Sequence, residues 1–206
     1  MKHYLCKMDL LTALKNKFDN PELKILKQNK NFGYDIYLLK PKNKPYQLVL
    51  TVGLSNKNQK PIEKYANLKH IELYFCLPEY WQIDDTHWSV DYINKIAQIP
   101  QKNNTWFGPG DTIPTAKPPV EISEKLKQSY FILSEPMLLE KELKTIQLEN
   151  KTIYFFAIIP IFKLEFEYKM RNSAKVLIAK MQYKKTNELV DEYRNSVARK
   201  RILGLF

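Results

Sequence analysis

Two acids and a histidine near the middle of the chain have the spacing that best suits catalysis. Asp84 and Asp85 are adjacent, and His87 follows two positions after Asp85. Carboxylates beside an imidazole can bind a hydrolytic metal ion or share a proton as general acid and base. However, residues within four consecutive positions rarely point at one ion, and the same residues also suit a polar turn that caps a helix. We interpret them as such a turn.

Other catalytic and metal-binding patterns are missing from the sequence. It contains no glycine-rich phosphate loop and no Gly-x-Ser-x-Gly nucleophile elbow. The three histidines and the two cysteines, Cys6 and Cys76, do not stand at the spacings that zinc sites use. We therefore expect no catalytic residue, no metal and no cofactor, and we predict that the protein is not an enzyme.

The cysteines and the apolar segments predict the compartment. Two cysteines in 206 residues do not make a disulfide framework, so we expect buried free thiols in a reducing compartment. Charged residues interrupt the first 14 positions, which leaves no hydrophobic region of a signal peptide. The longest apolar run, 153–162, is about half as long as a membrane span. The prediction is a cytoplasmic protein that does not bind membranes.

The net charge of +11 is unevenly distributed along the chain. Residues 71–150 hold 12 Asp and Glu against 7 Lys, whereas the segments on either side are basic. A basic balance is typical of proteins that bind nucleic acid or another acidic surface. Only four of the 33 basic residues are Arg, which nucleic-acid readers favour, and a lysine excess also fits a compositionally biased genome.

Hydrophobic periodicity predicts the strands that would position these residues. Strands are expected at 33–40, 46–54, 70–77, 128–134 and 151–162. The first two are separated by a proline-containing turn and should form a hairpin. The last is apolar along almost its whole length, which favours a central position in the sheet.

Helical spacing appears before, between and after the strands. Helices are expected at 8–18, 85–98, 164–184 and 186–197. Asp85 or Thr86 should cap the second helix and Pro100 should end it, before a long loop over 101–120. This order predicts a single α+β domain over residues 1–206, with a mixed, largely antiparallel sheet flanked by helices.

The segment from Cys76 to Pro114 carries an ordered set of Pro, Trp and Gly positions. The pattern consists of Leu-Pro at 77–78, Trp81, a helical segment from Trp88 to Pro100, and Thr-Trp at 105–106 before a glycine-bearing loop. It resembles the suppressor-of-fused (SUFU) domain family, and weaker agreement extends the signature to about residues 46–197. The signature residues that we expect to build the scaffold are Pro78, Trp81, Trp88, Pro100, Trp106, Gly108, Gly110 and Thr112.

The resemblance implies stoichiometric protein binding and no catalysis. Eukaryotic members of the family bind and restrain a transcription factor. Stand-alone bacterial members of about this length are associated with polymorphic toxin systems and contact-dependent inhibition, where they act as immunity proteins. Because this chain lacks a long regulatory insert, the resemblance favours the bacterial role, in which the partner is a cognate toxin domain.

Two surfaces could meet such a partner. For a basic toxin, the acidic middle of the chain and its tyrosines are the candidates: Glu72, Glu79, Tyr80, Asp84, Asp85, Asp91 and Tyr92. For an acidic toxin, the candidates are Lys40, Lys42, Lys44, Lys57 and Lys60. The alternative function is a nucleic-acid-associated protein that uses its basic ends, including Arg199, Lys200 and Arg201. The sequence does not predict the oligomeric state.

Overall fold

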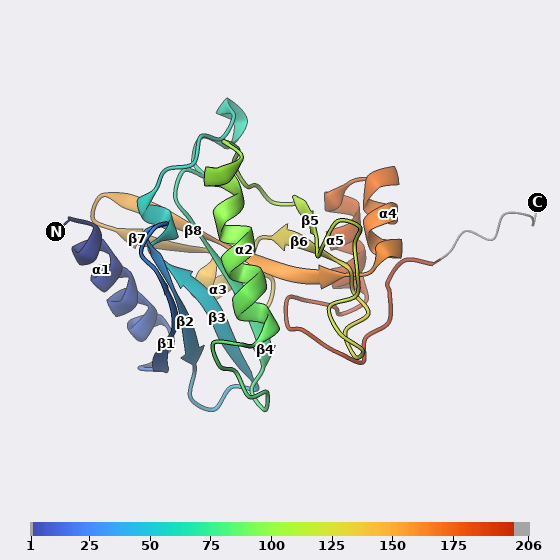
Figure 1. The fold of residues 1–206 in the computed structure, drawn as a ribbon, viewed down its shortest axis with the longest axis horizontal. Helices are drawn as coiled ribbons and strands as arrows, with labels where there is room; N and C mark the ends of the chain where they lie inside the picture. The colour runs from blue at the N-terminus through green and yellow to red at the C-terminus, as the bar shows by residue number, and fades with distance from the viewer. Residues whose placement is uncertain (1, 200–206) are drawn as a thin grey trace, which may run out of the picture.

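An eight-stranded sheet forms the centre of the computed structural model, which describes the backbone of residues 2–199 and the side chains of residues 7–199 (Figure 1). The strands are β1 (Glu22–Asn29), β2 (Tyr34–Lys40), β3 (Tyr46–Val52), β4 (Ile71–Pro78), β5 (Thr112–Pro114), β6 (Tyr130–Ser134), β7 (Thr145–Leu148) and β8 (Lys151–Ile161). Their order across the sheet is β1-β2-β3-β4-β8-β6-β5, and β7 also pairs with β8. Neighbours are antiparallel except β4 and β8, which are parallel.

The five predicted strands are all present, and β2 and β3 form the predicted hairpin. The predicted central position of β8 is also confirmed, because β8 lies between β4 and β6. The mixed, largely antiparallel sheet with flanking helices confirms the α+β class.

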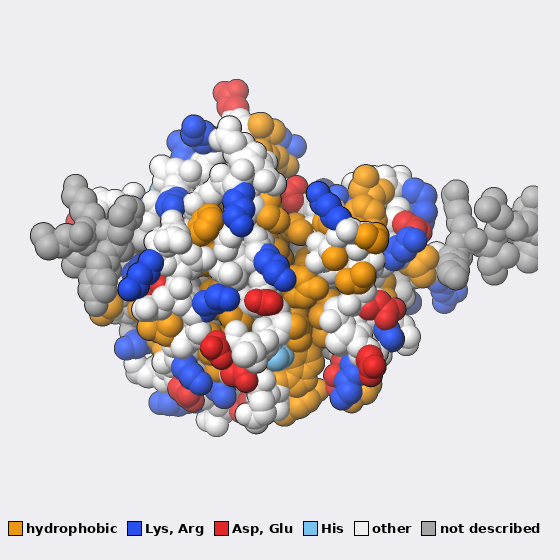
Figure 2. Space-filling model, in the orientation of Figure 1, with side chains coloured by type: hydrophobic (Ala, Val, Ile, Leu, Met, Phe, Trp, Pro, Cys, Tyr) orange, Lys and Arg blue, Asp and Glu red, His pale blue; other side chains and the backbone are white. Residues whose placement is uncertain are grey.

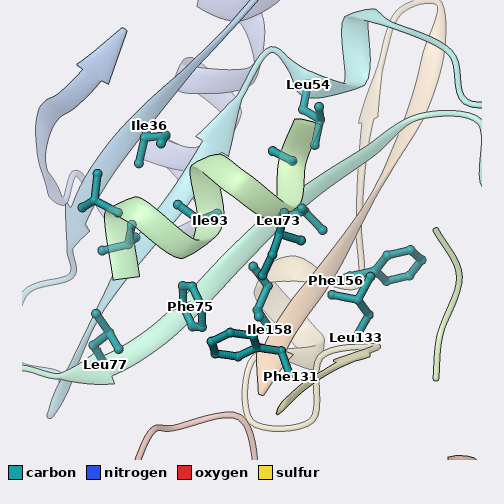
Figure 3. Close-up of a cluster of buried hydrophobic side chains, with 14 of the residues drawn as sticks. Ile36, Leu54, Leu73, Phe75, Leu77, Ile93, Phe131, Leu133, Phe156 and Ile158 are labelled. Carbon is teal, nitrogen blue, oxygen red and sulfur yellow. The ribbon is translucent and has the colours of Figure 1, made fainter. Parts of the chain in front are cut away.

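Five α-helices lie on the two faces of the sheet. They are α1 (Lys2–Lys17), α2 (Trp88–Lys102), α3 (Glu140–Leu143), α4 (Lys163–Arg171) and α5 (Ala174–Tyr183), with short 3-10 turns at Leu54–Asn56 and Glu63–Tyr65. α2 covers one face, where its Ile93 belongs to the same buried cluster as Phe75 and Phe156 of the sheet (Figure 3). α1, α3 and α5 contribute buried residues to the core on the opposite face.

Alternation along the strands explains how one sheet serves two cores. In β4, Leu73 and Phe75 belong to the core under α2, whereas Tyr74 and Cys76 belong to the other core. All four are fully buried. The continuous apolar run that marks β4 and β8 in the sequence therefore follows from burial on both faces. None of the helices in the described part of the chain is both long and apolar enough to cross a bilayer.

The helix predicted over 186–197 is wrong. Residues 186–199 follow an irregular path, and Leu189 forms an isolated parallel bridge with Cys76. The carboxylate of the buried Glu188 accepts hydrogen bonds from the backbone N–H groups of residues 137–139 at 2.8–3.0 Å. These tertiary bonds replace the local helical bonds that the sequence favours.

The other helix predictions need smaller corrections. The predicted helix 164–184 divides into α4 and α5, because Ser173 caps α5 by accepting the Val176 N–H. Pro100 does not end α2, which continues to Lys102 because the Asn103 N–H still reaches the Ile99 carbonyl at 3.0 Å. β1, β7 and α3 were not predicted from the hydrophobic periodicity, and β5 lies within the segment predicted as a loop.

Candidate functional site

The acid–histidine motif folds as a turn and a helix cap. Asp84 accepts hydrogen bonds from the backbone N–H and the hydroxyl of Thr86, at 2.9 and 2.7 Å. His87, not Asp85 or Thr86, is the N-cap of α2, and its Nδ1 accepts the Ser89 N–H. The Asp84 and His87 side chains therefore accept hydrogen bonds from nearby backbone N–H groups. Among the described residues, no three His, Cys, Asp or Glu side chains gather as a metal-binding set.

The electrostatics of this turn follow from its hydrogen bonds and burial. The hydrogen bonds from Thr86 lower the pKa of the Asp84 carboxyl, so Asp84 is a stable negative charge at neutral pH. Burial lowers the pKa of the His87 imidazole, and the nearby Asp84 charge opposes this effect only in part. A neutral imidazole is the form that can accept a hydrogen bond as a cap.

A chain of aromatic rings connects this turn to the core. The rings of Trp81 and Trp88 lie 6.3 Å apart, and the Trp88 ring contacts those of Phe75 and Tyr92 at 5.2 and 6.2 Å. Tyr92 in turn lies 4.8 Å from Phe131. Edge and tilted packing of this kind fixes the rings relative to one another, so the turn stands on a rigid base.

Acidic side chains project from this base. Glu79, Tyr80, Asp84, Asp85 and Asp91 are exposed, and Tyr92 is partly exposed. Figure 2 shows acidic side chains, interspersed with Lys and Arg, around the lower end of α2 and beside a band of hydrophobic side chains. We call Glu79, Tyr80, Asp84, Asp85, Asp91 and Tyr92 the acidic surface. All but one of the residues that the sequence predicts to meet a basic partner are thus at least partly exposed.

Glu72 is the exception and has to be removed from the candidate set. Its side chain is fully buried, and its two carboxylate oxygens accept hydrogen bonds from the Thr51 hydroxyl at 2.6 Å and the N–H groups of Gly53 and Ser55 at 2.9 and 3.0 Å. Burial raises the pKa of this carboxyl. The sequence could not reveal this, because the groups that donate to Glu72 come from β3 and the turn after it.

The predicted basic surface is divided by the fold. Lys40, Lys42 and Lys44 lie at the hairpin end of β3, whereas Lys57 and Lys60 follow its other end. A seven-residue strand is about 23 Å long, so these lysines do not form one patch. The turn with Lys42 and Lys44 adjoins the acidic surface, since the Glu79 N–H donates to the Pro45 carbonyl. Lys200 and Arg201 lie outside the described residues.

The sequence did not predict an apolar groove, which has a volume of about 1090 Å³. The length of the 101–120 loop was the available signal, because long loops in compact domains are often functional. The groove lies between the segment after α2 and helix α4, and its lining includes Trp106, Ile113 and Phe166. β5 forms one wall and is the last strand on this side of the sheet order. The signature residues Trp106 and Thr112 therefore border an open groove.

The glycine loop next to this groove depends on close packing. Gly110 has φ +94°, and a Cβ there would lie 2.5 Å from the Cβ of Ala174. A Cβ on Gly108 would lie 2.7 Å from the Trp106 ring. The Asp111 carboxylate also accepts the Gly108 N–H at 2.8 Å. These contacts agree with a scaffold role for Gly108 and Gly110.

The model of the suppressor of fused protein (SUFU) family matches residues 30–195. The chain belongs to the SUFU family. No curated protein matches it significantly. Among solved structures, the chain is similar to the Sufu–Fu complex crystal structure, with a TM-score of 0.66 and 17% identity over 93% of this chain and 92% of that chain.

A second similar structure is Drosophila Suppressor of Fused, with a TM-score of 0.63 and 15% identity. The match covers 93% of this chain and 51% of the Drosophila chain, so this SUFU chain spans about half the length of that relative. At these identities the structures establish the fold. The first of these structures is a complex of Sufu with Fu, so that relative binds a protein partner.

Proposed function

We propose that this SUFU protein is a cytoplasmic immunity protein. It acts as one SUFU-like domain and neutralises a cognate bacterial toxin domain by binding it one to one. The observation that carries the proposal is the acidic surface on a rigid aromatic base, in a family of protein-interaction domains. The acid–histidine turn is used for capping, which supports a binding role without catalysis.

The acidic surface fits a basic toxin domain. Long-range attraction between opposite charges speeds the first encounter, and buried aromatic anchors slow dissociation. Asp84 and Asp85 supply the attraction, whereas the Lys95 ammonium, 3.8 Å from the Asp91 carboxylate, offsets the charge of Asp91. Tyr80 supplies an anchor that is 68% exposed in the free protein. An immunity protein needs both properties, because it has to capture the toxin quickly and keep its active site covered.

Co-expression with the C-terminal toxin domain of a large secreted protein encoded beside this gene tests the proposal. We expect a stable one-to-one complex and protection of the cells from the toxin domain. Asp85→Lys should slow association about tenfold at low salt, because it reverses an exposed charge at the centre of the acidic surface. Glu149→Lys, at the exposed turn between β7 and β8, is the matched control and should leave association unchanged.

One observation favours the alternative of a nucleic-acid-associated protein. A hollow of about 780 Å³ beside α4 and α5 is lined by Arg171, Lys180, Lys184 and Arg199, with no acid among its described lining residues. Purified protein that retains nucleic acid, releases it at high salt and ignores the toxin domain would replace the immunity function with this one.

A further inference from the structure

The hollow beside α4 and α5 gathers positive charges from three parts of the chain. Its volume is about 780 Å³, and its described lining includes no acid and four cations: Arg171, Lys180, Lys184 and Arg199. The charges come from the end of α4, the end of α5 and the segment 197–199. Ligand sites in proteins usually have volumes of roughly 300–1,000 Å³, so the hollow has the size of a binding site.

Acidic side chains do not neutralise this hollow. Residues 168–187 contain six Lys and Arg and no Asp or Glu. None of the four lining cations takes part in the ion pairs that the described residues form. Glu167 lies one turn before Arg171 on α4, but it is not among the described lining residues. Like charges around one hollow repel one another, so the free protein has an unbalanced positive potential there.

Helix dipoles explain only part of this arrangement. Arg171 stands in the last turn of α4, and Lys180 stands in the last turn of α5. The partial negative charge of a helix C-terminus favours a cation at each of these positions. It does not account for Arg199, which lies outside the helices, or for the convergence of both helix ends with Arg199 on one hollow.

The walls of the hollow are held in place in the free protein. The Val197 N–H donates to the buried Glu165 carboxylate of α4 at 2.9 Å, which fixes the segment that leads to Arg199. The Lys180 ammonium lies 4.8 Å from the centre of the Tyr168 ring, so a cation–π contact holds this lysine beside α4. A ligand therefore meets a preformed site and has to order little of the backbone.

Linked phosphate groups match this distribution of charge. Four cations around one hollow are balanced by a ligand that carries several negative charges within the same volume. A chain of phosphates provides them, because each linked group carries a negative charge, whereas the carboxylates of a protein surface stand on separate side chains. The guanidinium groups of Arg171 and Arg199 suit two parallel hydrogen bonds to a phosphate, and the two lysines add point charges.

We propose that this hollow is a binding site for a ligand with several linked phosphate groups, either a free oligophosphate or the backbone of a single nucleic-acid strand. The hollow shares no described lining residue with the acidic surface. The inference therefore goes beyond the proposed function and does not depend on the toxin domain.

Titration of the purified protein, first freed of nucleic acid at high salt, tests the site with two probes. The probes are tripolyphosphate, followed by calorimetry, and a fluorescent oligothymidylate of about ten nucleotides, followed by anisotropy. A plot of log K for the oligonucleotide against log salt should have a slope of about −3, because each of four neutralised phosphates contributes about −0.7. The double variant Arg171→Ala/Lys180→Ala should weaken the binding of both probes about tenfold or more and bring the slope to about −1.4.

The double variant Lys42→Ala/Lys44→Ala is the matched control, because it removes two exposed positive charges from the turn between β2 and β3. Neither lysine lines the hollow, so the affinity for both probes should stay within about twofold of the wild type. Thermal unfolding without ligand should show that both double variants remain folded, because neither removes a partner of an ion pair.

The outcomes distinguish the site from a general effect of charge. Equal weakening in the two double variants would show that binding follows net charge and would overturn the site, as would a wild type that binds neither probe. Polyglutamate that binds as tightly as the phosphate probes would overturn the assignment to phosphates in favour of an acidic protein. Loss of binding confined to Arg171→Ala/Lys180→Ala would support the site, and the tighter of the two probes would then identify the source of the phosphates.

Discussion

Glu165 and Arg194 form a buried ion pair that fastens the C-terminal segment to the start of α4. The Glu165 side chain is fully buried and the Arg194 side chain is 9% exposed. The Glu165 carboxylate also accepts the N–H groups of Phe162 and Val197, both at 2.9 Å. Arg194 stacks over the Phe162 ring and donates to the Pro160 carbonyl. One carboxylate thus joins the C-terminal segment to the junction of β8 and α4.

Removal of Arg194 should be strongly destabilising. Arg194→Ala leaves the Glu165 charge buried without its partner, which costs about 3–5 kcal/mol in the free energy of unfolding. Urea denaturation measures the loss. Arg171→Ala, at an exposed position on α4, is the control and should stay within about 0.5 kcal/mol of the wild type. Equal stabilities of the two variants would show that the pair does not hold the segment.

Glu72 should make stability depend on pH. Burial raises its pKa above the ordinary value of 4.5, so the folded protein holds this proton more tightly than the unfolded chain. The contribution of Glu72 to the free energy of unfolding is therefore fully present below pH 4.5, and it is lost as the pH rises through the raised pKa of the folded state. Glu72→Gln imitates the protonated form and does not titrate.

The comparison of the wild type with Glu72→Gln isolates this effect. The free energy of unfolding of the wild type, measured relative to the variant, should fall as the pH rises above 4.5 and then level off. A difference that stays constant from pH 4 to pH 8 would contradict the raised pKa. Glu72→Ala should be less stable than Glu72→Gln at every pH, because it leaves the N–H groups of Gly53 and Ser55 buried without an acceptor.

His87 should make stability depend on pH in the opposite direction. Burial lowers its pKa below 6.5, so its contribution to stability is present above pH 6.5 and is lost as the pH falls through the lowered folded pKa. His87→Asn keeps a capping acceptor but does not titrate, and it should remove this dependence. NMR titration of the imidazole gives the pKa directly, and a value at or above 6.5 would disprove the expectation.

The glycine loop should tolerate no side chain at position 110. Gly110→Ala combines a positive φ with a clash against Ala174, whereas Gly33→Ala has a positive φ of +77° but a nearest neighbour at 3.6 Å. Gly33→Ala should cost about 1 kcal/mol from backbone strain alone. Gly110→Ala should lower the free energy of unfolding by more than Gly33→Ala does. Chemical denaturation of both variants measures the difference, which is the cost of the clash with Ala174. Equal losses would mean that α5 moves away freely.

Hydrophobic periodicity predicted the helices and strands in which buried positions recur at regular spacing. The strand at 70–77 and the helix that carries Ile93 are examples, because apolar periodicity records which side faces the core. The predicted helix at 186–197 failed because Glu188 and Arg194 bond to distant segments, and no local pattern records such partners. β1 was missed because most of its side chains are polar.

The same distinction between local and distant contacts applies to the candidate site. Asp84, Asp85 and Asp91 could be grouped because they lie close together in the chain, and all three are exposed. Glu72 could not be separated from them by sequence, since its partners come from β3 and the turn after it.

The parallel pairing of β4 with β8 has a consequence for how the chain is made. β4 is complete about 70 residues before β8 begins, so during synthesis β1–β4 can form as a meander whose last strand has one open edge. That edge carries Leu73, Phe75 and Leu77, which are fully buried in the finished sheet. An open apolar edge favours self-association. The nascent protein is therefore most exposed to aggregation, and most dependent on chaperones, while residues 79–150 are being translated.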